Sequence, residues 1–225
     1  MRTISSSPLR RAGCLVALGL ALVVASSATA LTLRDLVVGG ASLSTESGNL
    51  TFGNFDAVVS GALSADLEDY TVETRGEGLV IVGPVGAVGG DVGDLAVSFD
   101  VWAAEGLAVS GVSLFFNGAV SGDGALAAVT EDILVEGTPL ADLFVHTFQA
   151  GGEVFAEKLD STGLVPPLAH FRVLKDIQVL SAGVDSVATL SVVSQEFAVI
   201  PEPGTMLLLG AGLAGLALAG RTRRS

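Results

Sequence analysis

Catalytic side chains are scarce in this chain of 225 residues. It contains two histidines, His146 and His170, and one cysteine, Cys14, which lies in an apolar segment near the amino terminus. Nucleophilic catalysis needs a serine or cysteine beside a base, and Ser113 does not complete a nucleophile elbow because Phe115 stands where that motif has glycine. We therefore expect that the protein is not an enzyme. An extracellular hydrolase with paired carboxylates is the alternative, since 24 residues are acidic.

One glycine- and aspartate-rich segment is the candidate cation site. Residues 89–94 resemble a single unit of a calcium-binding repeat, although no second copy follows. Carboxylates and backbone carbonyls in loops are the usual ligands of calcium, so Asp91 and Asp94 are the calcium candidates, with a solvated turn as the alternative. No other metal and no cofactor are expected, because two isolated histidines do not make a zinc site. The acidic group at residues 66–69 is expected to be a solvated face.

Two aromatic residues could bind sugar. Trp102 and Tyr70 could each stack on a sugar ring, as aromatic side chains do in carbohydrate-binding domains. Trp102 falls on the strand face opposite Val101, which would expose it. A core position is the alternative that we favour for Trp102 from the sequence alone.

The charge distribution excludes a nucleic-acid partner. The formal net charge is −13, and six of the 11 Lys and Arg residues lie close to the two ends of the chain. The interior is therefore strongly acidic, and it repels phosphate backbones and anionic lipid headgroups. Such a surface favours cations and basic or hydroxyl-rich partners.

The middle of the chain, residues 31–200, predicts one all-β domain. Short apolar runs are separated by glycine and acidic turns, and no apolar stripe has a helical period. This spacing predicts a single antiparallel β-sandwich of the jelly-roll or Ig-like kind. The expected strands are residues 50–59, 70–74, 79–82, 95–101, 107–116, 125–135, 140–148, 171–179 and 187–199.

Several details of this domain are also predicted. Val187 to Val199 is expected to be a central strand that is apolar on both faces. Gly83 to Gly93 is expected to form one long loop, and Asn117-Gly118 and residues 121–124 are expected to be turns. Pro166-Pro167 is expected to break the chain before the last two strands.

The amino terminus, residues 1–30, predicts a signal peptide. A basic leader is followed by an uncharged apolar run, and Ala28 and Ala30 supply the small residues that signal peptidase requires at a cleavage site. An uncleaved anchor is the alternative, but the apolar run is shorter than the ~20 residues that a membrane span needs.

The carboxyl terminus, residues 201–225, has three parts. Residues 201–204 read Pro-Glu-Pro-Gly, residues 205–220 form an apolar run, and a basic tail follows at residues 221–225. The apolar run predicts a short transmembrane helix, and Arg221, Arg223 and Arg224 would stop transfer and remain in the cytoplasm. A plain single-span anchor is one interpretation of this tail.

The tail also closely resembles the PEP-CTERM sorting signal of exported proteins in Gram-negative bacteria that make exopolysaccharide. The resemblance implies that Pro201, Glu202 and Pro203 are recognised by an exosortase, a membrane protease. It further implies an inner-membrane intermediate, followed by delivery to the cell surface or the extracellular matrix.

We therefore expect an exported structural or adhesive protein that associates with extracellular polysaccharide. Its other partners would be signal peptidase, the exosortase-like protease and, through the apolar helix, the membrane. A calcium- or carbohydrate-binding module is the alternative function.

Overall fold

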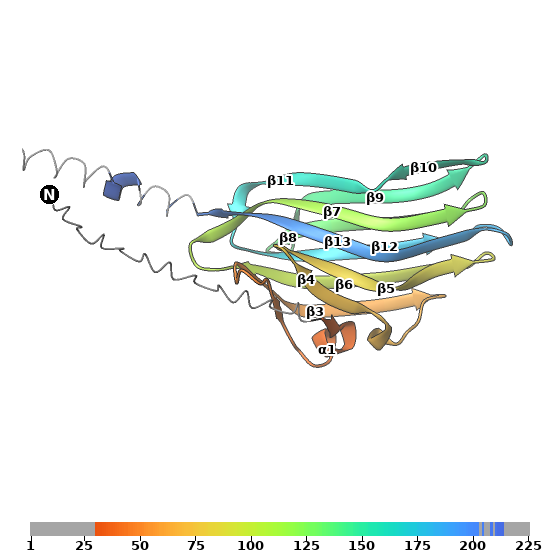
Figure 1. Cartoon of the computed structure of the whole chain (residues 1–225), viewed down its shortest axis with the longest axis horizontal. Helices are drawn as coiled ribbons and strands as arrows, with labels where there is room; N and C mark the ends of the chain where they lie inside the picture. The colour runs from red at the N-terminus through yellow and green to blue at the C-terminus, as the bar shows by residue number, and fades with distance from the viewer. Residues whose placement is uncertain (1–29, 203, 205–207, 209, 214–225) are drawn as a thin grey trace, which may run out of the picture.

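A computed structural model describes residues 30–202, 204, 208 and 210–213 of the chain. Two antiparallel sheets pack face to face, as Figure 1 shows, and this confirms the predicted sandwich. Sheet A has the strand order β1 (Leu31–Thr32), β4 (Thr71–Arg75), β5 (Gly78–Val88), β13 (Val187–Pro201), β7 (Leu107–Ser121) and β11 (Leu159–Leu168). Sheet B has the order β10 (Glu153–Glu157), β9 (Thr138–Ala150), β8 (Leu126–Val135), β12 (His170–Leu180), β6 (Val92–Ala103), β3 (Leu50–Gly61) and β2 (Leu43–Ser44).

Alternating side chains build the core between the sheets. On β6, Leu95, Val97, Phe99 and Val101 are all buried, as the period-2 pattern predicts. Aromatic contacts then join the two sheets, because Phe52 of sheet B lies 5.7 Å from Phe197 of sheet A between ring centroids. Each fully buried large apolar side chain contributes roughly 1.5–3 kcal/mol, so this core needs no disulfide.

Two short helices cover one edge of the core, beside β1 and β3. Helix α1 (Leu33–Val37) buries Leu33 and Leu36, and Thr32 caps it by accepting a hydrogen bond from the Asp35 amide. The 3₁₀ turn η1 (Leu67–Asp69) begins after Asp66, whose side chain accepts a hydrogen bond from the Glu68 amide. Both caps satisfy backbone N–H groups that a helix terminus leaves unpaired.

The predicted loop at Gly83 to Gly93 is wrong. Strand β5 continues to Val88 and β6 begins at Val92, so a short turn carries the chain from sheet A to sheet B, and in it Gly89 and Gly90 have positive φ values of 64° and 101°. The glycines within the strands have a packing reason, because a Cβ on Gly83 would lie 2.4 Å from the Tyr70 ring. A glycine cluster here marks close packing instead of a loop.

The expected turn at Asn117-Gly118 is also wrong, since both residues lie inside β7. A Cβ on Gly118 would lie 2.2 Å from the Phe116 ring, which folds over that position. The other expected turn is confirmed, because β7 ends at Ser121 and β8 begins at Leu126.

Strand β13 lies inside sheet A as predicted, but it is not apolar on both faces. Ala188, Leu190, Val193 and Phe197 face the core, whereas residues such as Glu196 are exposed. One face of an antiparallel sandwich sheet meets solvent, which explains the alternation. Pro166 and Pro167 lie within the edge strand β11, and the pairing with β7 shifts register between Gly163 and Leu168 instead of ending there.

The predicted terminal segments fall largely on positions that are not described. Ala28, Pro203, Arg221, Arg223 and Arg224 lie outside the described residues. The described residues contain no helix that is long and apolar enough to span a membrane.

Candidate functional site

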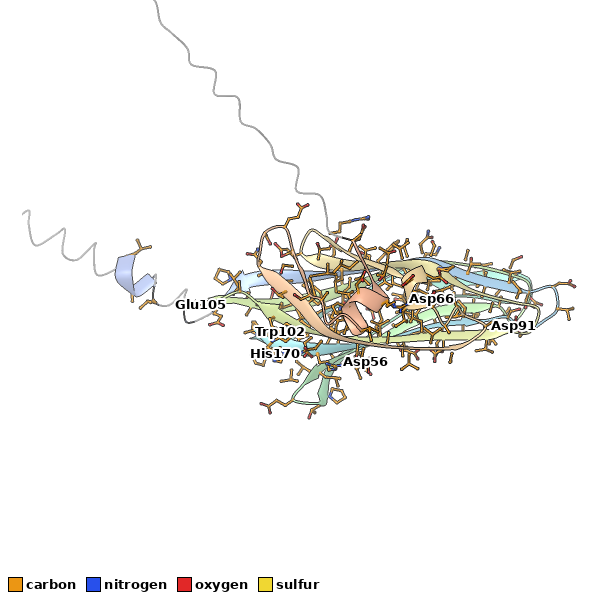
Figure 2. The ribbon with its side chains drawn as sticks, turned by 90° about the horizontal axis from the view of Figure 1, so that it is seen from below. Asp56, Asp66, Asp91, Trp102, Glu105 and His170 are labelled. Atoms are coloured by element: carbon orange, nitrogen blue, oxygen red, sulfur yellow. The ribbon has the colours of Figure 1, made fainter. Side chains whose placement is uncertain are left out.

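An aromatic platform lies on the outer face of sheet B. Trp102 on β6 and His170 on β12 are cross-strand partners, and their rings stack with centroids 5.2 Å apart and planes at 7°. Figure 2 shows the two labelled side chains next to each other over the lower part of the ribbon. Trp102 is half-buried and His170 is exposed, so the favoured core position for Trp102 is wrong.

A bulge in β3 adjoins this platform. The pairing of β3 with β6 shifts register between Gly53 and Asp56, and Asn54 adopts a positive φ of 52°. Asparagine tolerates this left-handed conformation better than most residues. A Cβ on Gly53 would lie 3.2 Å from the Trp102 ring, so glycine lets the indole pack closely against the strand.

A polar network adjoins the platform. Asp100 accepts hydrogen bonds from Asn54 Nδ2 at 2.7 Å and from Arg172 Nη1 at 3.1 Å. The Arg172 Nη2 atom also donates to Ser98 Oγ at 2.7 Å. Three strands, β3, β6 and β12, therefore fix one charge-assisted cluster in place. Such preorganised donors and acceptors beside a ring can bind a hydroxyl-rich ligand.

A groove of about 430 Å³ continues along the same face. Its walls come from β3, β6, β8 and β12, and they include Asp56, Ser98, Asp132, Leu174 and Asp176. Ser98 belongs both to the polar network and to the groove wall. The platform, the network and the groove therefore form one continuous surface, which we call the β6–β12 face.

A carboxyl pair lies at the far end of the β6–β12 face. Asp94 and Asp176 each have one buried carboxyl oxygen without a donor in the described part of the chain. A hydrogen bond with Asp176, burial and the Asp176 charge raise the pKa of Asp94 to about 6. One proton shared by the two carboxyls would satisfy both oxygens, and Gln178 donates to Asp176 at 2.6 Å.

The two calcium candidates do not converge on one loop. Asp91 is exposed in the β5–β6 turn, and Figure 2 shows it far from Trp102. Asp94 lies inside β6 and faces Asp176. Among residues 30–202, no group of three or more His, Cys, Asp or Glu side chains could hold a metal ion. The assignment of calcium to Asp91 and Asp94 therefore stays a prediction.

The acidic group at residues 66–69 is confirmed as a solvated face. Asp66, Glu68 and Asp69 are exposed, and Glu68 accepts a hydrogen bond from Arg34 at 3.0 Å. Exposed ion pairs of this kind contribute little to stability.

Two other residues singled out from the sequence have structural roles. Tyr70 is fully buried and donates its hydroxyl hydrogen bond to the Ser64 carbonyl, so it cannot stack on a sugar. His146 is half-buried on β9 and stacks between Phe144 and Phe148, at centroid distances of 4.9 and 5.6 Å. Neither residue touches the β6–β12 face.

The carboxyl-terminal motif begins directly at the end of the sandwich. Pro201 is the last residue of β13 and pairs with Leu107 of β7, and the Glu202 amide donates to the Gly106 carbonyl at 2.8 Å. Pro201 is exposed and Glu202 is half-buried. The start of the motif is therefore held against the β6–β7 turn.

Sequence reasoning missed Asn54, Asp100 and Arg172. Asn54 lies 46 positions before Asp100, and Arg172 lies 72 positions after it. Only the register of the strands brings the three residues together. One sequence pattern does point to this surface. Asp100 and Trp102 alternate along β6 with Phe99 and Val101, which are buried, so both side chains are expected to point away from the core.

The carboxyl-terminal tail indicates an exported protein with a sorting signal. Residues 199–224 match the family model of the PEP-CTERM protein-sorting motif, as the resemblance implied. The motif indicates export and sorting through a membrane-associated exosortase system. No curated protein matches the chain.

Several solved structures are similar to this chain at a low level. One is the carbohydrate-binding module TmCBM61 in complex with β-1,4-galactotriose, with 11% identity, a TM-score of 0.32, and coverage of 65% of this chain and 88% of that one. Another is the endoglucanase 3 of Trichoderma harzianum from family GH12, with 8% identity, a TM-score of 0.22, and coverage of 65% and 98%. A tailspike protein of bacteriophage CBA120 shows 13% identity and a TM-score of 0.28, over 67% of this chain and 19% of that one.

Proposed function

We propose that this protein is a non-enzymatic, structural or adhesive component of an extracellular polysaccharide matrix, and that it holds glycan chains on the β6–β12 face. The sorting motif supports a location outside the cytoplasm, at the surface of a Gram-negative bacterium or in its matrix. Signal peptidase and an exosortase-like protease would act during export.

The observation that carries this proposal is the stacked Trp102–His170 pair beside the Asp100–Arg172 network. A sugar ring has an apolar face that packs on an aromatic ring, and its hydroxyl groups can donate to Asp100 or accept from Arg172. The groove then gives a longer glycan a path across the strands β3, β6, β12 and β8.

The charge of the β6–β12 face selects among glycans. Its acidic residues include Asp56, Asp94, Asp132 and Asp176, whereas Arg172 is tied to Asp100. A neutral, hydroxyl-rich glycan therefore fits this face better than a polyanionic one does, because like charges repel across a binding surface.

The carboxyl pair does not favour a hydrolase. Asp94 and Asp176 lie close enough for Asp176 to raise the pKa of Asp94 to about 6, whereas the two carboxyls of a glycosidase are held at least about 5 Å apart to admit the sugar or a water. The non-enzymatic function is accordingly the one we propose.

Substitution of Trp102 tests the proposal. The exported, processed form would migrate through native gels that contain a soluble neutral glucan, a neutral galactan or polygalacturonate. We expect retardation by a neutral glycan, and we expect Trp102→Ala to weaken it about tenfold, because loss of the platform costs ~1.4 kcal/mol.

Phe115→Ala is the matched control, since Phe115 is an exposed aromatic residue on β7 of the other sheet. We expect it to leave the retardation unchanged. Retardation by none of the glycans, or equal losses in both variants, would contradict glycan binding at the β6–β12 face.

A further inference from the structure

A buried polar triad crosses the core directly beneath the β6–β12 face, because Lys175 also lines the groove. Lys175 of β12, Glu131 of β8 and Gln195 of β13 are 3%, 1% and 1% exposed. Lys175 and Glu131 are cross-strand partners in sheet B, whereas Gln195 reaches them from sheet A. Moving a charged pair from water into the core costs several kcal/mol per ion unless close contact and hydrogen bonds compensate for the lost hydration. Such a costly arrangement points to a role for the triad beyond packing.

The contacts within the triad form a chain of proton-transfer partners. Lys175 Nζ donates to Glu131 Oε2, and Gln195 Nε2 donates to Glu131 Oε1. The carbonyl oxygen Oε1 of Gln195 is buried and has no hydrogen-bond partner in the described chain. One carboxyl group therefore bridges the amine of Lys175 and the amide nitrogen of Gln195.

Burial of the triad favours the neutral form of the Glu131 carboxyl. Desolvation raises the pKa of Glu131, and the Lys175 charge and hydrogen bond oppose this shift. A neutral lysine amine is a nucleophile, and a buried carboxyl that contacts two nitrogens can accept a proton from one while it gives a proton to the other.

We propose that Lys175 and Gln195 join in an intramolecular amide cross-link between the two sheets, with Glu131 as the proton relay. Lys175 Nζ attacks Cδ of Gln195, so that the Nζ–Cδ bond forms and the Cδ–Nε2 bond breaks. Glu131 takes the proton from Nζ on one oxygen and delivers a proton to Nε2 from the other. The amine and the carboxamide become a secondary amide and one ammonia, with no oxidant or co-reactant.

Such a cross-link would have a clear use in this chain. The single cysteine, Cys14, lies ahead of the sandwich, so no disulfide can join the sheets. The amide would connect β12 to β13, and β13 leads directly into the sorting motif. A load applied at that end would then reach sheet B through the Lys175–Gln195 amide instead of through the whole of β13 and the turn between β12 and β13.

Peptide mapping of the exported, denatured protein tests the proposal. Trypsin does not cut after an acylated lysine, and the next basic residue after Lys175 is Arg221. We expect one peptide that starts at Val173, remains uncut after Lys175, contains Gln195, and is lighter than its sequence by the mass of one ammonia. Fragmentation should place the missing mass between Lys175 and Gln195.

The same digest distinguishes the Lys175–Gln195 amide from two other reactions that would also lower the mass. Asn117-Gly118, which can lose ammonia by closing to a succinimide, lies in the peptide Gly76 to Lys158. An amide between Lys175 and Glu131 would instead join that peptide to the one that starts at Val173, with loss of one water, and it would overturn the assignment of Gln195. Normal cleavage after Lys175 with full mass would overturn the cross-link itself.

Variants add an independent check of each role. Lys175→Arg should restore cleavage at position 175 and the full mass, and Glu131→Gln should do the same because the relay is lost. Lys175→Met keeps a long apolar side chain, so it supplies the uncross-linked reference if the Lys175→Arg variant does not fold. A persisting mass deficit in Glu131→Gln would contradict the relay.

Discussion

The carboxyl pair of Asp94 and Asp176 makes the β6–β12 face sensitive to pH. The pKa of Asp94 rises from 3.8 to about 6 because of its hydrogen bond with Asp176, its partial burial and the neighbouring charge. The folded protein therefore binds a proton more tightly than the unfolded chain does. The stability that this proton contributes is complete below pH 3.8 and is lost as the pH rises through about 6.

We expect Asp94→Asn to raise the melting temperature at pH 7.5, roughly one and a half units above the shifted pKa, because it removes the repulsion between two carboxylates. The advantage over the natural protein should disappear near about pH 4, where the carboxyl is protonated and can donate as the amide does. Thermal unfolding followed by circular dichroism at several pH values measures this difference.

Asp132→Asn is the control for this prediction. It removes one negative charge from the same face, at an exposed position on β8 that is not part of the pair. An equal, pH-independent stabilisation in both variants would mean that general charge repulsion, and not the Asp94–Asp176 pair, is responsible.

Residue-level reasoning from the sequence reached only part of this face. The alternation with Val101 places Trp102 on an outer surface, and Asp94 stood out by its glycine-rich surroundings. The buried Lys175 was not predicted to be special, although it shares the phase of the apolar residues Phe171, Val173, Ile177 and Val179 and the alternation therefore already points to its burial. Its partners Glu131 and Gln195 are 44 and 20 positions away in the chain, and no local pattern connects them.

Among the elements, the β8–β9 hairpin carries a conformational cost. Its two-residue loop consists of Glu136 and Gly137, with φ values of 51° and 79°. A loop with two positive φ values is of the type that prefers Asn-Gly, and glutamate is strained in the left-handed region.

We expect Glu136→Asn to increase the free energy of unfolding by about 0.5–1 kcal/mol, because asparagine tolerates a positive φ. Chemical denaturation of the two proteins gives this difference. Glu105→Asn is the matched control, since Glu105 also precedes a glycine in a short turn, the one between β6 and β7, but does not have a positive φ. A similar gain from Glu105→Asn would show that the hairpin strain is not the cause.

Most strands were predictable because one apolar face repeats every second residue. The wrong loop at Gly83 to Gly93 and the wrong turn at Asn117-Gly118 have one cause. Glycine is common in turns, but it also occurs inside strands where a neighbouring side chain packs against the backbone. Gly83 and Gly118 lie inside strands because the rings of Tyr70 and Phe116 occupy the space of a side chain. A ring that folds over a glycine cannot be foreseen without the pairing of β4 with β5 and the path of β7.

At the scale of the whole molecule, the important feature is where the proposed binding surface lies relative to the carboxyl-terminal sorting motif. The Trp102–His170 platform lies near the end of the sandwich where the chain leaves towards the sorting motif, as Figure 2 shows. The motif starts without a linker, because Pro201 still pairs with Leu107. We infer that an exosortase-like protease must bind the motif close to the folded domain, and that release leaves the β6–β12 face intact.

The intact mass of the protein outside the cell tests this account most directly. In cells that have the exosortase, we expect a single form that begins at Leu31 and lacks the apolar segment and the arginines after the Pro-Glu-Pro motif. In cells without it, the tail should remain and the protein should stay in the membrane fraction. An extracellular form that keeps residues 205–225, or identical masses in both strains, would contradict the account.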